Sequence, residues 1–105
     1  MRDKTSISHD DVMVKKLRRR PQFAPEYLKA AMQEADDPEA LLVALRHVAK
    51  ARGGVAKVAK SAGLERESLY QALSEDGNPR LSTLLGIMKA IGLKLTVETA
   101  HPVHS

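Results

Sequence analysis

The chain has 105 residues and a net charge of +4, with 43% hydrophobic, 29% charged and 3% aromatic residues but no cysteine. This length favours a single domain, and the composition excludes an intrinsically disordered chain. The lack of cysteine excludes disulfides, thiol nucleophiles and cysteine-ligated zinc. No apolar run approaches the roughly 20 residues that span a membrane. Residues 1–5 lack the apolar stretch of a signal peptide, so we expect a cytoplasmic protein.

The positive charge is concentrated in two segments. Residues 1–20 have a net charge of +4 and residues 39–63 of +4, whereas residues 21–38 have a net charge of −3. A small basic chain suits a polyanionic partner such as nucleic acid. A solvated basic surface is the commoner explanation, so the charge alone leaves both interpretations open.

Two helices are predicted in the N-terminal part of the chain. The first covers residues 9–19, with Asp10 or Ser8 as its candidate N-cap. The second covers residues 22–35 and has Pro25 in its first turn, where a missing backbone N–H costs least. Apolar residues at helical spacing give each helix one apolar face: Val12, Met13 and Leu17 in the first, and Phe23, Tyr27, Leu28, Ala31, Met32 and Ala35 in the second.

Residues that favour helix ends delimit four further helices. Asp37 is the predicted N-cap of the first of them, Gly53 and Gly54 end it, and Gly92 ends the last. The predicted helices cover residues 38–52, 55–61, 65–73 and 81–91. The apolar face of the last one consists of Leu81, Leu84, Leu85, Met88 and Ile91.

A strand is predicted over residues 93–99, where apolar and polar side chains alternate. A lone strand leaves its backbone N–H and C=O groups unpaired, and no second strand is evident in the sequence. The partner is either the same strand of a second subunit, which we favour, or residues 5–8. We therefore predict a homodimer.

The helices over residues 55–61 and 65–73 form a candidate helix-turn-helix. Gly63 supplies the positive φ or close backbone approach that the turn needs, and the small Ala59 allows the second helix to cross tightly. The exposed face of the second helix consists of Glu65, Arg66, Glu67, Ser68, Tyr70 and Gln71. Side chains with hydrogen-bonding ends at the start of such a helix suit base edges in the DNA major groove.

Several stretches of the chain follow one known pattern. They are residues 25–31 (PEYLKAA), 37–46 (DPEALLVALR), 51–54 (ARGG), 59–64 (AKSAGL), 66–74 (RESLYQALS), 77–79 (GNP) and 90–95 (AIGLKL). Together they resemble the Cro/CI-like (XRE) helix-turn-helix family, and within it the HigA-type antidote (antitoxin) proteins of bacterial addiction modules. The resemblance covers about residues 9–98. The first short helix departs from the pattern by opening with Val55-Ala56-Lys57, where many members have a polar Ser or Gln.

The resemblance implies an all-α, lambda-repressor-like fold of five to six helices, to which the alternation over residues 93–99 adds one C-terminal strand. We expect an N-terminal helical extension over residues 1–36, a helix-turn-helix domain over residues 37–99 and a disordered tail over residues 100–105. The implied function is sequence-specific binding of double-stranded DNA as a dimer at the operator upstream of the protein's own gene. The implied second partner is a small basic ribonuclease toxin.

Carried over by position, the resemblance places Arg66, Glu67 and Tyr70 against base edges. The candidate phosphate contacts are Lys57, Ser68, Gln71, Asn78 and Arg80. Such contacts fix the register on DNA without reading its sequence. Each residue also has a simpler explanation: Arg66 and Glu67 as solvated charges, Tyr70 as a core or dimer residue, and Asn78 as a turn residue. The basic cluster over residues 15–20 is a weaker candidate DNA contact, since an exposed basic face is the commonest outcome.

Enzymatic function, cofactors and metal binding find no support in the sequence. The acid pairs lie at predicted helix starts, and the four histidines, two of them His101 and His104 near the C-terminus, lack the spacing of metal ligands. Two alternatives to the antidote remain. One is a protein–protein interaction module on a helix-turn-helix scaffold, and the other is a small repressor without a toxin partner.

Overall fold

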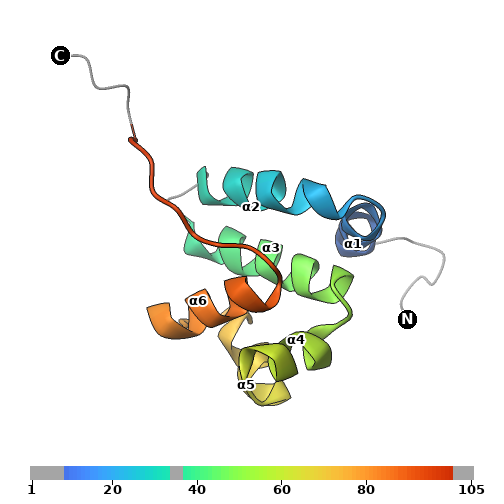
Figure 1. Ribbon diagram of the computed structural model, residues 1–105, viewed down its shortest axis with the longest axis vertical. Helices are drawn as coiled ribbons and strands as arrows, with labels where there is room; N and C mark the ends of the chain where they lie inside the picture. The colour runs from blue at the N-terminus through green and yellow to red at the C-terminus, as the bar shows by residue number, and fades with distance from the viewer. Residues whose placement is uncertain (1–8, 34–36, 101–105) are drawn as a thin grey trace.

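Six α-helices and one short 3-10 turn make up the described part of the chain, residues 9–33 and 37–100 of a computed structural model (Figure 1). The elements are α1 (His9–Arg19), η1 (Pro21–Phe23), α2 (Ala24–Gln33), α3 (Pro38–Ala51), α4 (Val55–Ala62), α5 (Arg66–Ala72) and α6 (Leu81–Ala90). No strand is present in these residues, so the predicted all-α class is confirmed. The predicted helix over 22–35 is in fact η1 followed by α2, and its last residues lie outside the described part.

The predicted helix ends are confirmed where they depend on local chemistry. The Asp37 carboxylate accepts a hydrogen bond of 3.0 Å from the Glu39 backbone N–H, and Pro38 occupies the first position of α3. This side chain satisfies a backbone donor that the helix itself cannot. Gly53 and Gly54 follow α3 with φ angles of 112° and 103°, which other residues rarely adopt.

Helix α3 lies at the centre of the fold, with α1 and α2 against one side and α4 leading to α5 and α6 on the other (Figure 1). One hydrophobic core contains residues from all six helices. Leu45 and Val48 of α3 are both fully buried, and burying an aliphatic side chain of this size contributes roughly 1.5–3 kcal/mol. The boundary predicted after residue 36 stays a prediction, because residues 34–36 lie outside the described part.

The predicted apolar faces are only partly correct. In α1, Leu17 of the predicted face is buried, whereas Val12 is 50% exposed and Val14, which the prediction left out, is buried. In α6, Leu81 and Leu85 are exposed by 64% and 43%, although they share the predicted apolar face with buried Met88 and Ile91. A helix buries only the part of its apolar stripe that faces a neighbour, and a single sequence does not give the position of that neighbour.

The strand predicted over residues 93–99 is wrong for the described chain, which has no regular secondary structure there. Leu93 and Leu95 are half-buried against the helical core, whereas Val97 is 96% exposed. The alternation therefore reflects packing of one side of an irregular segment onto helices, because a strand also needs a second strand for its hydrogen bonds. The alternative partner, residues 5–8, and the tail over 101–105 lie outside the described residues.

Candidate functional site

The turn between α4 and α5 has the geometry that the sequence predicts. Gly63 ends α4 in the left-handed conformation with a φ angle of 72°. The Leu64 backbone N–H donates to the Ala59 carbonyl oxygen at 2.8 Å, which satisfies a carbonyl group at the end of α4. Ala59 is buried and Leu64 packs against the core. The turn therefore fixes the direction in which α5 leaves α4.

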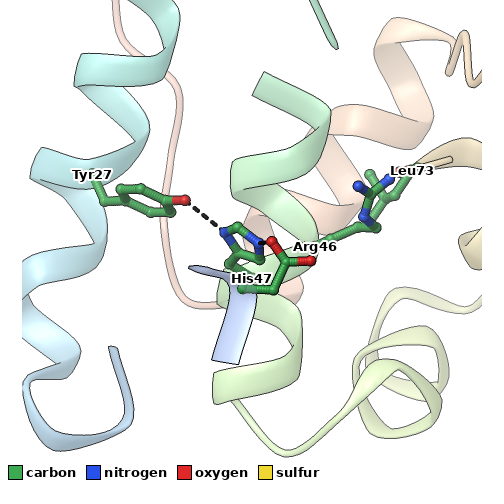
Figure 2. A network of polar contacts seen from close by, with 5 residues as sticks. Tyr27, Arg46, His47 and Leu73 are labelled. Carbon is green, nitrogen blue, oxygen red and sulfur yellow. Dashed lines mark hydrogen bonds and ion pairs between the residues drawn. The ribbon is translucent and has the colours of Figure 1, made fainter. Parts of the chain in front are cut away.

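Helix α5 is anchored from beneath by apolar side chains and at its end by one charged group. Leu69 is fully buried and Leu73, directly after the helix, is 1% exposed. The Arg46 guanidinium of α3 donates to the Leu73 carbonyl oxygen (Figure 2). This hydrogen bond satisfies a carbonyl that the helix leaves without a partner, so α5 is tied to the central helix at its C-terminal end.

The outer face of α5 is polar and open to solvent. All five predicted site residues on this helix are exposed: Arg66, Glu67, Ser68, Tyr70 and Gln71. The Arg66 guanidinium lies 5.5 Å from the centroid of the Tyr70 ring, a cation–π distance. Tyr70 is 45% exposed, which does not support the alternative that it is a core residue. The helix thus presents hydrogen-bonding groups on a rigidly anchored element.

The remaining predicted site residues flank α5 without forming a single cluster. Ser68, Gln71 and Asn78 line one shallow depression of about 430 Å³ between α5 and the loop before α6. Arg80 is exposed at the start of α6. Lys57 is exposed on α4, and its side chain lies over Gly53. A Cβ atom added to Gly53 would come within 2.6 Å of the Lys57 Cδ atom.

Sequence reasoning missed a polar network on the other side of α3. The Tyr27 hydroxyl lies 2.6 Å from Nδ1 of His47, and Nε2 of His47 lies 2.9 Å from Oδ1 of Asp10 (Figure 2). An ionised carboxylate only accepts hydrogen bonds, so Nε2 donates to Asp10. In the neutral imidazole Nδ1 is then an acceptor, to which Tyr27 donates. The network joins α1, α2 and α3.

Neighbouring groups shift the pKa values of two members of this network, Asp10 and Tyr27. The hydrogen bond from His47 holds the pKa of Asp10 below its usual value, against the smaller opposing effect of burial. Burial, with the nearby charge of Asp10 as a second cause, raises the pKa of the Tyr27 hydroxyl. Both shifts favour the forms that the hydrogen bonds require: an ionised Asp10 and a protonated Tyr27.

This network is structural, despite the acid–imidazole–hydroxyl order that also occurs in hydrolases. His47 is 1% exposed, and both of its ring nitrogens are occupied by protein groups. The candidate assignment of Asp10 as N-cap is wrong, because Asp10 lies within the first turn of α1 and its carboxylate bonds to α3. Ser8, the other candidate, lies outside the described residues.

Other kinds of site find no support in residues 9–33 and 37–100. These residues contain no group of three His, Asp or Glu that could hold a metal ion. None of their helices is both long and apolar enough to cross a lipid bilayer. His101 and His104 lie outside this range.

Comparison with known proteins identifies the family. The family model described as "Probable addiction module antidote protein" matches residues 10–99. A protein of Haemophilus influenzae (strain Rd), described as an uncharacterized protein, is 43% identical over 72 residues, which cover 69% of this chain and 72% of the relative. No solved structure gives a significant match. The chain therefore belongs to the family of addiction-module antidotes.

This membership confirms the coarser part of the sequence-based interpretation. An antidote implies a toxin as its partner, and such families are generally non-enzymatic. The helix-turn-helix assignment, the DNA contacts, the dimer and the nature of the toxin stay predictions.

Proposed function

We propose that this antidote is a sequence-specific DNA-binding protein of the Cro/CI-like class that represses its own operon. The observation that carries this proposal is the outer face of α5. Its polar side chains are exposed, while Leu69 beneath them is fully buried and the Gly63 turn fixes the helix on α4. A rigid scaffold that presents hydrogen-bonding groups on a protruding helix is what major-groove recognition needs.

In this proposal the first turns of α5 read base edges. Arg66 forms a bidentate pair with a guanine, a contact worth about 1–3 kcal/mol of discrimination against other bases. Glu67 accepts from a cytosine amino group, and Tyr70, in cation–π contact with Arg66, limits the positions that the guanidinium can take. A guanidinium with fewer positions loses less side-chain entropy when it binds a base.

The flanking polar residues then contact phosphates. Ser68, Gln71 and Asn78 line the same depression beside α5, so they can hold one stretch of backbone. Lys57 and Arg80 add exposed positive charge on either side of α5 in the sequence. These contacts set the position of α5 along the duplex and carry no sequence information themselves.

A homodimer follows from the weakness of a single module. One module makes few phosphate contacts and would bind weakly at physiological salt, whereas a dimer doubles them and places two recognition helices about 34 Å apart. We propose that residues 93–99 form the interface. Its one backbone hydrogen bond within the described residues runs from the Leu93 N–H to the Met88 carbonyl oxygen at 2.9 Å, and it carries Val97, which is 96% exposed.

The proposed toxin is a small basic ribonuclease. The net charge of −3 over residues 21–38 suits a basic partner, and this segment includes the exposed Glu26 on α2. In such a module the antidote both holds the toxin and limits its own synthesis.

Fluorescence anisotropy with the DNA upstream of the protein's own gene tests the proposal. Wild type, Arg66→Ala and the control Lys29→Ala, at an exposed position on α2, are titrated against this duplex and a scrambled duplex over a salt series. We expect preferential binding by wild type and Lys29→Ala, and a loss of about 1–3 kcal/mol of that preference in Arg66→Ala. Equal weak binding to both duplexes, unchanged in Arg66→Ala, would leave α4 and α5 as a scaffold for protein partners.

A further inference from the structure

A basic groove lies beside Tyr70 of α5, on the α1 side of the molecule. It has a volume of about 430 Å³ and is bounded by α1, the end of α3, the start of α4 and Tyr70 of α5. Its charged residues are Lys15 and Arg18 of α1, Lys50 of α3 and Asp11. Three cations therefore face one carboxylate, which leaves the groove with an excess of two positive charges.

The cations of this groove are available to a ligand. Lys15, Arg18 and Lys50 are all exposed, and none of them forms an ion pair with another residue in the described part of the chain. Arg18 donates to the Lys50 carbonyl oxygen at 3.5 Å, a long hydrogen bond that holds α1 close to the end of α3. The three charges thus come from two helices, and tertiary packing brings them together.

Tyr70 connects this groove to the proposed reading surface. Its ring lines the groove and also lies on the outer face of α5, 5.5 Å from the Arg66 guanidinium. The three cations line the same groove as Tyr70, so the groove places positive charge next to the outer face of α5.

We propose that this groove binds the phosphodiester backbone of DNA next to the base pairs that α5 contacts. The inference rests on the proposed DNA-binding function and extends it to the N-terminal helices. Lys15 and Lys50 make the phosphate contacts, and Arg18 supplies a third cation. Contacts of this kind strengthen binding to any sequence and steepen its salt dependence, because each one releases condensed counterions.

The test is the double variant Lys15→Gln/Lys50→Gln, measured by fluorescence anisotropy on upstream and scrambled DNA at several salt concentrations. The control is Lys29→Gln/Lys89→Gln, which removes the same charge from exposed positions on α2 and α6 outside the groove. All four substituted side chains are exposed, so circular dichroism should show an unchanged fold. A charge-reversal variant, Lys15→Glu, changes the charge of the same groove by the same two units at a single position and should likewise weaken binding to both duplexes.

For Lys15→Gln/Lys50→Gln we expect binding to both duplexes to weaken by about tenfold or more near 0.1 M salt, with the preference between them retained. The salt slope should fall by about 2 for each bound protomer, and the control should stay within about twofold of wild type. Upstream-DNA binding by wild type together with an unchanged Lys15→Gln/Lys50→Gln variant would overturn this inference alone. No preferential binding by wild type would overturn the proposed function as well.

Discussion

Polar side chains are arranged differently on the two sides of helix α3: on one side they are paired around a buried residue, and on the other they face solvent. On the side of α1 and α2, Asp10, Tyr27 and His47 satisfy one another in a network around a buried imidazole. On the side of α4 and α5, apolar Leu69 and Leu73 hold the structure, and the polar side chains of α5 face solvent. The central helix thus packs against an inward-facing polar network on one side and, on the other, against elements that carry an outward-facing polar surface.

The difference shows where recognition can occur. Groups that already have protein partners gain little from a ligand, because each new hydrogen bond would replace an existing one. Exposed groups on an anchored helix exchange water for a ligand at smaller cost. The buried network between α1, α2 and α3 therefore contributes stability, whereas the outer face of α5 contributes the surface proposed to read DNA bases.

The largest effect on stability is expected from Leu69→Ala, which removes the fully buried anchor of α5. We expect a loss of about 3 kcal/mol in the free energy of unfolding, from lost burial and the resulting cavity. The control Leu81→Ala, at a leucine that is 64% exposed, should change it by less than about 0.5 kcal/mol. Urea unfolding measures both variants, and equal losses would contradict the assigned anchor.

The next effect concerns the loop that follows α5. A Cβ atom on Gly77 would collide with the backbone carbonyl of Ala72, coming within 2.7 Å of its carbon. Gly77→Ala should therefore cost about 2 kcal/mol, because backbone has to move. Gly86→Ala is the matched control in α6, where a Cβ meets nothing within 4 Å. It should be neutral or stabilising by up to about 1 kcal/mol in the same unfolding experiment.

A smaller loss is expected from Tyr27→Phe on the inward-facing side. The variant keeps the ring but leaves Nδ1 of the buried His47 without its partner, at a cost of about 1.5 kcal/mol. Tyr70→Phe removes the same hydroxyl from an exposed ring and should leave stability unchanged within about 0.5 kcal/mol. A Tyr27→Phe protein as stable as wild type would show that the network contributes nothing.

The smallest expected effect is the pH dependence that Asp10 confers. Its pKa is lower in the folded than in the unfolded protein, so its stabilising contribution is complete above the unfolded value of about 3.9. The contribution is lost as the pH falls through the lower folded value. The stability difference between wild type and Asp10→Asn should thus shrink as the pH falls below about 4. A difference that grows below about pH 4 would contradict the assigned pairing.

Much of the fold could be predicted because its signals are local. Asp37 before Pro38, the glycine pair after α3 and Gly63 each act on the backbone within a few residues, and the helix limits follow from them. The exposed face of α5 could also be predicted, since the buried position of Leu69 determines which residues point away from the core.

What could not be predicted depends on residues far apart in the chain. Tyr27 and His47 are 20 residues apart, and His47 and Asp10 are 37 apart. A histidine among the buried residues of α3 indicates that it needs a partner, but no spacing identifies which one. The error at residues 93–99 has a similar origin, because alternation records which side chains face the core and not what pairs with the backbone.

The most direct test of the central claim is a ¹H–¹⁵N correlation spectrum of the protein, recorded with and without saturating DNA from upstream of its own gene. The outward-facing side should respond: the backbone signals of α5 and of Lys57 should shift, while those of α2 stay in place. Shifts confined to α2, or no shifts at all, would contradict the claim that α5 is the surface that contacts DNA.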